Sequence, residues 1–378
     1  MLVFGRFLYY GKSFVGGADG LSQVAPTMQY TGQYYRALLK NILQGNLQIP
    51  MWDMSIGFGM NILQVISFDP VYILCSVLFV HDIAVGIAIF DMLCLYLAGI
   101  MFIALCYNLG CNRYAALAAA LAYIFNGYIL NYCIAQNSFL RLFIVLPMIL
   151  LGVYNVTKKN RYGIFVLAVL YNITLGPLNI YTIGIVLIFC FCMAYIFSDR
   201  KKGVADFFSY IWKPVLIYIL EMLVMAVFLI PTMYKVVSGG RIGNASINFQ
   251  WLYDVSYYRS LFHGLVGVDE IGIHGYIGVT TIAILAVVCL VIKGNKSLLE
   301  KELLIAIFPI GSYLFNGGIG FNHRFLFIIA FYLCIVLAVM LPKLFELEER
   351  EKKKLCISIL IYLAFYAVIS VWSDKNVD

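Results

Sequence analysis

Charged residues are scarce in this sequence. Asp, Glu, Lys and Arg make up 12% of its 378 residues, whereas 63% are hydrophobic. A soluble domain carries charge on about a quarter of its residues. This composition therefore excludes soluble enzymes, nucleic-acid-binding modules and secreted disulfide scaffolds, and it predicts an all-α polytopic membrane protein. The net charge of +7 comes from short Lys and Arg clusters between apolar runs, a pattern typical of membrane topology and not of nucleic-acid partners.

Metal-binding cysteine motifs are also lacking. The ten cysteines include no Cys-x2-Cys pair, and all lie inside apolar stretches or at their edges. We interpret them as small buried apolar residues, because neither a zinc site nor a disulfide framework has this spacing.

Long apolar runs dominate what is present. A membrane-spanning helix needs roughly 20 mostly apolar residues, and about ten runs approach that length. They lie at 84–107, 114–134, 139–157, 162–177, 178–197, 213–233, 276–292, 302–316, 324–341 and 355–372. Gly176-Pro177 ends the fourth and Pro309 interrupts the eighth, which predicts broken or tilted helices there.

Basic residues occupy alternate connections between these runs, and short basic loops stay in the cytoplasm. The cytoplasmic loops are those with Arg113, with Lys158 to Arg161, with Arg200 to Lys202, with Lys293 to Lys301, and with Lys343 to Lys354. Residues 1–83 therefore form an external segment with interfacial helices. Residues 84–378 form the transmembrane bundle, with an external loop at 234–275.

The N-terminal residues contain no segment that could direct their translocation across the membrane. Residues 1–10 are too short to span and contain Arg6, and no apolar signal-peptide region precedes the external segment. We therefore expect an upstream span that this chain does not contain, and poor insertion in its absence.

Two helices are expected in the external segment. Apolar residues recur at helical spacing between 22 and 45, which indicates an amphipathic helix at the outer interface; the alternative is a soluble surface helix. Asp69-Pro70 opens an apolar run that ends at Val80 and is too short to span. We interpret Asp69 as the N-cap of a second interfacial or re-entrant helix, with Pro at its first position.

Asp19 lies in a glycine-rich loop just before the first of these helices. A carboxylate beside lipid head groups can act as a general base or hold a divalent cation. The alternative is an ordinary turn residue, because Asp is common between glycines in turns.

Several motifs, in this order, resemble the bacterial YfhO-type membrane proteins. They are Asp19-Gly-x-x-Gln23, Gly45-Asn46, Pro50-x-Trp52, Gly57-Phe58-Gly59, Asp69-Pro70, Phe125-Asn126-Gly127-Tyr128, Leu146-Pro147, Asn316-Gly317 and Asn322-His323-Arg324. The resemblance covers most of the chain. From this resemblance we expect a further span before Asp19 and a longer C-terminal region after Asp378, neither of which this sequence contains.

The resemblance implies a fold similar to the GT-C superfamily. Those proteins take a sugar from a polyprenyl-phosphate carrier and attach it outside the membrane, in this family to cell-envelope polymers such as teichoic acids. It also implies a catalytic acidic residue in the first external loop, a position that Asp19 matches. Gln23, Trp52 and Asp69 share these motifs and are expected to bind substrate.

A lipid phosphate at the outer surface requires cations at that depth. Two cationic positions are expected at that depth: Arg324 with its neighbour His323, and Arg141 at the external start of the third span. Arg binds phosphate through two parallel hydrogen bonds. The alternative is that these side chains only extend to the membrane interface.

Other acidic residues leave alternatives open. His263, Asp269, Glu270 and His274 could hold a metal ion, although their spacing matches no strong ligand pattern. Asp91 and Glu221 lie within predicted spans, where each forms a hydrogen bond between helices or belongs to a proton relay.

The leading hypothesis is a glycosyltransferase that uses a polyprenyl-phosphate sugar at the outer face of the bacterial cytoplasmic membrane. Its partners would be membrane lipids, that donor and an envelope polymer as acceptor. The alternatives are a flippase or secondary transporter, which would use Asp91 and Glu221, and a non-catalytic membrane scaffold.

The alternation of basic loops predicts that residue 55 is external and residue 160 cytoplasmic. Single cysteines at Ser55 and Asn160, in a cysteine-free background, are treated with a membrane-impermeant thiol reagent. In intact cells we expect labelling at 55 only, and at both positions after lysis. Labelling at 160 but not at 55 in intact cells would reverse the orientation.

Overall fold

The part of the protein that the structure describes is helical, with two very short strands. The computed structural model describes residues 4–5, 9–17, 19–175, 203–238, 252–267, 269–293 and 322–374. Its contacts divide the chain into two compact units, residues 1–98 with 133–244 and residues 99–132 with 245–378. Helix α4 (Ile83–Asn108) contributes residues to both. The predicted division at residue 83 stays a prediction.

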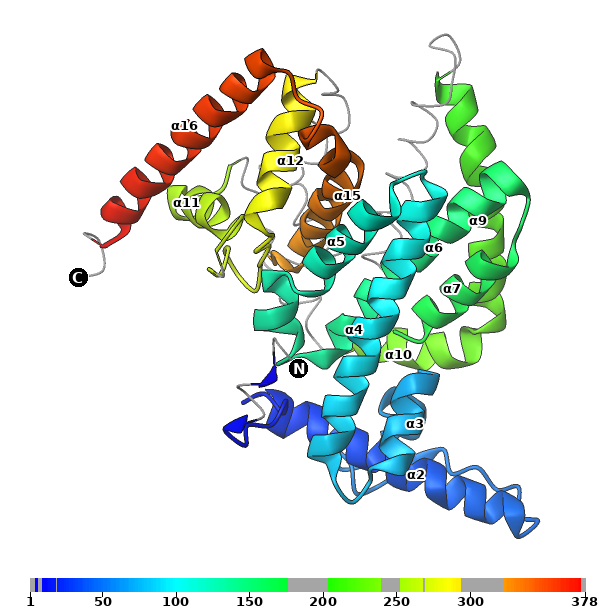
Figure 1. The fold of residues 1–378 in the computed structure, drawn as a ribbon. Helices are drawn as coiled ribbons and strands as arrows, with labels where there is room; N and C mark the ends of the chain where they lie inside the picture. Colours follow the sequence, from blue (N-terminus) through cyan, green and yellow to red (C-terminus); the bar gives the residue numbers. More distant parts are fainter. Residues whose placement is uncertain are drawn as a thin grey trace. The chain divides into compact units, whose positions relative to one another are not determined.

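The N-terminal segment of the first unit is built on two helices that lie side by side (Figure 1). A one-turn π-helix η1 (Gly20–Val24) leads into α2 (Ala25–Leu43), and α3 (Pro70–Leu78) follows. A Cβ at Gly32 of α2 would lie 2.2 Å from the Ser76 carbonyl oxygen, so only glycine permits this close crossing. Arg36 donates through Nε to the Val77 carbonyl at 2.8 Å, which satisfies a free acceptor at the end of α3.

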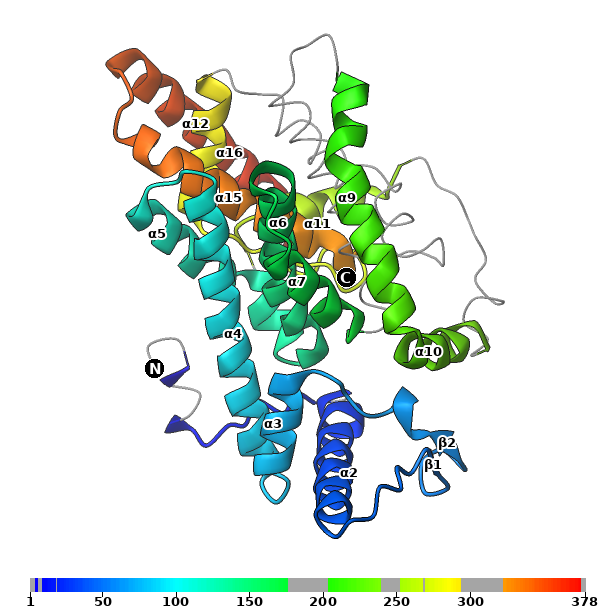
Figure 2. The same cartoon turned by 90° about the vertical axis from the view of Figure 1, so that its right-hand side faces the viewer.

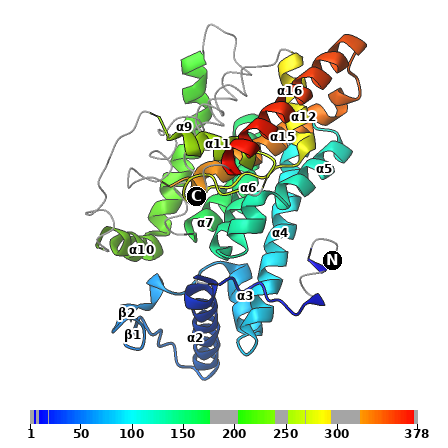
Figure 3. The same cartoon turned by 90° about the vertical axis from the view of Figure 1, so that its left-hand side faces the viewer.

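A hairpin connects these helices. Strands β1 (Trp52–Asp53) and β2 (Met60–Asn61) pair antiparallel beside α2, and a 3-10 turn η2 (Ile62–Gln64) follows (Figure 3). The Tyr30 hydroxyl of α2 donates to Asp53 Oδ2 at 2.8 Å and holds the hairpin. Asp69 accepts from the backbone N–H groups of Val71 and Tyr72, which confirms its predicted role as the N-cap of α3.

Helix α6 (Leu140–Lys159) follows a 3-10 turn η4 (Asn137–Phe139) and packs against α7 (Gly163–Ile173). Asn160 adopts left-handed geometry at φ 50° and ends α6, and basic Lys158 and Lys159 occupy its last turn. A Cβ at Gly152 would lie 2.6 Å from Cα of Phe165, so glycine sets the separation of α6 and α7.

The span expected at 213–233 is not one helix. Helix α9 (Gly203–Val224) ends before Met225, and α10 (Ala226–Ser238) runs across the end of α9 (Figure 2). The Phe228 N–H donates to the Met225 carbonyl three residues back, which tightens the chain at the bend. The apolar run continues through this bend, so its hydropathy predicts a single span.

The second unit contains α5 (Arg113–Ile124), α11 (Val255–Gly264), α12 (Thr281–Ile292), η6 (Arg324–Leu326), α15 (Phe327–Leu344) and α16 (Glu349–Asp374). The rings of Phe102, Tyr123 and Phe331 meet in its core, with Phe102 and Tyr123 stacked 4.6 Å apart. Lys293 pairs with Glu351 at 2.8 Å and links the end of α12 to α16.

The span expected at 114–134 is interrupted. Helix α5 ends at Ile124, and a separate π-helix η3 (Ile129–Cys133) begins after it. The Asn126 side chain accepts from the Ile129 N–H at 2.9 Å, and the Gly127 N–H donates to the Gly278 carbonyl. Backbone groups at this break are thus paired with a side chain and another segment, as an interrupted helix requires.

Three described helical segments are long and apolar enough to cross a membrane: Ile83–Asn108, Asn137–Lys159 and Arg324–Leu344. Shorter apolar helices occupy Arg113–Ile124, Gly163–Ile173 and Thr281–Ile292. The prediction of a helical membrane protein is confirmed, whereas the count of ten spans and the GT-C-like arrangement stay predictions. The expected spans at 178–197 and 302–316 lie outside the described residues.

The close packing of α6 on α7 generates a stability prediction. Gly152→Ala forces the backbones apart and should lower the free energy of unfolding by about 1–3 kcal/mol, the usual cost of overpacking. Thermal unfolding of the purified protein in detergent measures it. The control is Gly163→Ala at the start of α7, where a Cβ would meet no atom within 4 Å. Equal melting temperatures for both variants would contradict the prediction.

Candidate functional site

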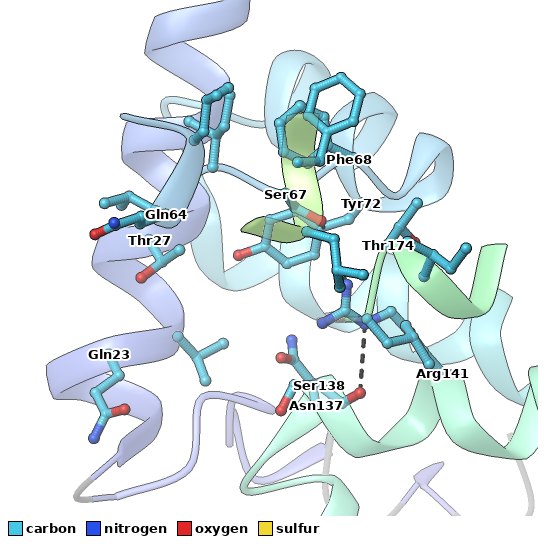
Figure 4. A pocket seen from close by; sticks show the side chains of 18 of the residues that line it. Gln23, Thr27, Gln64, Ser67, Phe68, Tyr72, Asn137, Ser138, Arg141 and Thr174 are labelled. Carbon is cyan, nitrogen blue, oxygen red and sulfur yellow. Dashed lines mark hydrogen bonds between the residues drawn. The ribbon is translucent and has the colours of Figure 1, made fainter. Parts of the chain in front are cut away.

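A cavity of about 270 Å³ lies within the first unit. Its walls come from η1 and α2, the segment between η2 and α3, the η4–α6 corner, the end of α7, and α10 (Figure 4). Its polar lining residues are Gln23, Thr27, Gln64, Ser67, Tyr72, Gln136, Asn137, Ser138, Arg141 and Thr174. Phe68 and Phe228, whose rings lie 4.3 Å apart, belong to its apolar lining. The cavity thus combines apolar walls with convergent polar groups, as small-molecule sites do.

Arg141 is the cation of this cavity. Its Nε donates to the Ser138 carbonyl at 3.4 Å, its Nη1 reaches Ser67 Oγ at 3.4 Å, and its guanidinium lies 5.9 Å from the centre of the Tyr72 ring (Figure 4). These hydrogen bonds are long, and the side chain is only 12% exposed. A guanidinium held in this way can still form short hydrogen bonds to an anionic ligand.

Asp69 orients Arg141 from behind the lining. Its Oδ2 lies 3.7 Å from Arg141 Nη1 and accepts from the Tyr171 hydroxyl at 3.0 Å, and the residue is fully buried. The same carboxylate caps α3 through Oδ1. Asp69 is thus a structural residue that supports the cavity, and it does not line the cavity itself.

Asp19 lies beside the cavity and is joined to it by two amides. Its Oδ1 accepts from Gln23 Nε2 at 2.7 Å, and its Oδ2 accepts from Gln136 Nε2. Both glutamines line the cavity. Asp19 precedes η1 but makes no side-chain capping hydrogen bond there.

The glycine before Asp19 has a packing role. A Cβ at Gly16 would lie 2.8 Å from Cα of Ala135, so the loop approaches the 135–136 segment closely. That approach brings Asp19 within reach of Gln136. A Cβ at the neighbouring Gly17 would meet no atom within 4 Å, so this packing depends on Gly16.

The residues around Asp19 do not fit a divalent cation. Both carboxylate oxygens accept from amide N–H groups, and hard cations require several oxygen ligands. The described residues contain no group of three or more His, Cys, Asp or Glu side chains that could hold a metal ion. The residues proposed for a metal in the second unit form two separate pairs, His263 with Asp269 at 3.9 Å and His274 with Glu270 at 3.6 Å.

The sequence analysis missed Gln136, Asn137 and Ser138. These three polar residues follow one another between two apolar runs, immediately before a predicted span. A polar triplet at that depth was an available signal, because such residues rarely enter a membrane boundary without a partner.

The sequence of the whole chain decides the family. The model of the bacterial membrane protein YfhO family matches residues 1–378. The chain belongs to the YfhO family. No curated protein and no solved structure matches it.

In this YfhO-family protein, three predicted site residues are not among those that line the cavity. Trp52 is on β1, 59% exposed, and its indole N–H donates to Met54 Sδ at 3.2 Å. His323 and Arg324 belong to the second unit, where the Arg324 guanidinium lies 5.7 Å from the centre of the Tyr132 ring. Of the predicted residues, the structure therefore brings together Asp19, Gln23, Asp69 and Arg141.

His323 is buried among tyrosines. Its ring centre lies 5.0 Å from that of Tyr253 and 4.8 Å from that of Tyr257, and its Nδ1 accepts from the Ile273 N–H at 3.0 Å. That hydrogen bond assigns the proton of the neutral ring to Nε2. Burial lowers the pKa of His323 to about 4, so the ring is neutral at pH 7.

The lowered pKa predicts loss of stability in acid. The unfolded chain, with a His pKa near 6.5, binds more protons than the folded protein between about pH 6.5 and 4, so stability falls as the pH falls through that window. Between pH 7 and 5 this group should cost about 2 kcal/mol. Thermal unfolding at both pH values measures it, and His323→Gln should reduce the difference. An equal pH dependence in both proteins would contradict the burial effect.

Proposed function

We propose that this protein is a glycosyltransferase that uses a polyprenyl-phosphate sugar at the outer face of the bacterial cytoplasmic membrane. The acceptor is a hydroxyl of a cell-envelope polymer. The observation that carries the proposal is the position of Asp19, held by two amides that line a cavity whose cation is Arg141.

Asp19 has the chemistry of a general base. Each oxygen accepts one amide hydrogen bond, and an ionised carboxylate offers about four acceptor positions. A free position remains for the acceptor hydroxyl. Asp19 takes its proton as the hydroxyl oxygen attacks the anomeric carbon, and the bond from that carbon to the lipid phosphate oxygen breaks.

Arg141 supports the departure of the phosphate. Negative charge grows on the leaving oxygen in the transition state, and a preoriented guanidinium stabilises such charge. Its partner Asp69 fixes its direction and is itself held by the Tyr171 hydroxyl. Burial raises the pKa of Tyr72, which keeps this phenol a neutral donor beside the same cavity.

Asp19→Asn tests the base. Asn keeps the shape but removes the proton acceptor, so transfer of labelled sugar from a polyprenyl-phosphate donor in proteoliposomes should fall about 10²–10⁴-fold. The control is Asp82→Asn, an exposed carboxylate in the turn before α4 that lies outside the cavity.

Arg141→Lys separates binding from proton transfer. Lys retains the charge but cannot form two parallel hydrogen bonds to the phosphate, so the KM for the donor should rise.

For the base, transfer by Asp19→Asn at the wild-type rate would remove Asp19 from the mechanism.

A further inference from the structure

The β1–β2 hairpin exposes apolar side chains that the described part of the fold leaves uncovered. Phe58 at its tip is 100% exposed, Met54 70% and Trp52 59%. The end of α2 and the chain that leads into the hairpin expose four more, Leu43, Leu47, Ile49 and Met51. We call these seven side chains the hairpin surface. Exposed apolar surface of this kind usually marks an interaction site.

Charge is almost absent from this part of the chain. Between Leu43 and Phe68 the only charged residue is Asp53, whereas a water-exposed surface carries charge on roughly a quarter or more of its residues. The Asp53 carboxylate accepts from the Tyr30 hydroxyl at 2.8 Å, and from the N–H and hydroxyl of Ser55 at 2.8 and 2.7 Å. Three donors of the hairpin and α2 thus satisfy this charge, and the hairpin surface offers apolar contact alone.

The backbone presents Phe58 to the outside at a cost to folding. Phe58 has φ 64° and lies between Gly57 at φ 54° and Gly59 at φ 113°. Left-handed geometry is unfavourable for a bulky side chain, and glycine would suit this position better. Full exposure means that the described fold gives the ring no packing in return. A strained and unpacked aromatic residue indicates a contact outside the chain.

The hairpin is fixed to the helices around it. The Tyr34 hydroxyl of α2 donates to the Pro50 carbonyl at 3.1 Å, and the Tyr35 hydroxyl donates to the Ser67 carbonyl at 3.0 Å. After β2, the Gln64 side chain donates to the Pro231 carbonyl of α10 at 3.1 Å. Figure 3 shows the hairpin beside α2 and next to α10. The exposed tip is therefore presented by a fixed element of the first unit.

The helix that holds the hairpin lies at the start of a membrane-crossing helix. Helix α4 begins at Ile83, directly after Asp82, and is apolar enough to cross a membrane. A membrane boundary is thus expected near Asp82. Arg36 of α2 reaches this point, because its Nη1 lies 3.3 Å from His81 Nε2. Since the same helix holds the hairpin through Tyr30 and Tyr34, the hairpin surface lies near that boundary.

We propose that the hairpin surface binds the lipid bilayer, with Phe58, Met54 and Trp52 inserted where the head groups meet the acyl chains. Aromatic side chains favour this depth. The hairpin backbone stays among the head groups, because unpaired backbone groups are not tolerated in the hydrocarbon core. Lipid suits a surface without charge better than a protein partner does, since protein interfaces have a polar rim. The inference does not depend on the proposed glycosyltransferase activity.

A fluorescent probe on a single cysteine measures the insertion. Phe58→Cys is made in the cysteine-free full chain, labelled with bimane and placed one copy per nanodisc in phosphatidylcholine, which has no net charge. The control is Lys353→Cys, an exposed position in the charged first turns of α16. A nitroxide on the lipid acyl chain should quench the probe at 58 several-fold more strongly than the probe at 353. Aqueous iodide should show the reverse order.

The two quenchers distinguish lipid from other occupants. Equal quenching by iodide at both positions would show that the hairpin tip lies in water and would overturn the proposal. Protection of position 58 from both quenchers would show that protein covers the tip, which also overturns it. Because each nanodisc holds one copy, a second copy of the chain cannot produce the expected result.

Removal of the Phe58 ring tests its part in the insertion. With the probe at Met54→Cys, Phe58→Gly should reduce quenching by the acyl nitroxide and increase quenching by iodide. Glycine favours left-handed geometry, so this substitution preserves the turn. The control is Phe345→Gly, which removes another exposed phenylalanine at the end of α15 and should leave both values unchanged. Unchanged quenching in Phe58→Gly would overturn the insertion of Phe58.

Discussion

The ion pair of Asp69 and Arg141 is the interaction on which the first unit depends. It joins the start of α3 to the start of α6, and the Tyr171 hydroxyl adds α7 to the same carboxylate. Because Asp69 is fully buried, removal of Arg141 would leave an uncompensated charge, which usually costs about 3–5 kcal/mol. The pair therefore fixes where three helices begin or end and, with them, the walls of the cavity.

Close backbone contacts at glycine give this arrangement its dimensions. Gly32 allows α2 to touch α3 at Ser76, Gly152 allows α6 to touch α7, and Gly16 allows the N-terminal loop to reach Ala135. Each contact brings one wall of the cavity toward another. Asp19 meets Gln136 only because the third contact exists.

The cavity combines groups with separate tasks. Arg141 provides charge, Tyr72 a neutral hydroxyl, and Asp19 a proton acceptor at the edge. The carboxylate of Asp69 lies behind the lining, where it faces Arg141 at the start of α6. One short segment, from residue 136 to 141, therefore contacts both Asp19 and Asp69.

The sequence by itself determined the membrane class, the family, the helices at 22–45 and 84–107, and the Asp69 cap, whereas its assignment of Asp19 and Arg141 to a site stays a prediction. These depend on hydropathy, on local backbone chemistry and on motif order, all of which are encoded in neighbouring residues. Only the tertiary structure decided that the apolar runs at 114–134 and 213–233 break, because Gly127 pairs with Gly278 and the chain bends at Met225. It also decided that Trp52 lies away from the cavity while Gln136 and Asn137 line it. Those outcomes depend on contacts between residues far apart in the chain, such as Asp19 with Gln136. The pattern of neighbouring residues does not specify which distant residues come into contact.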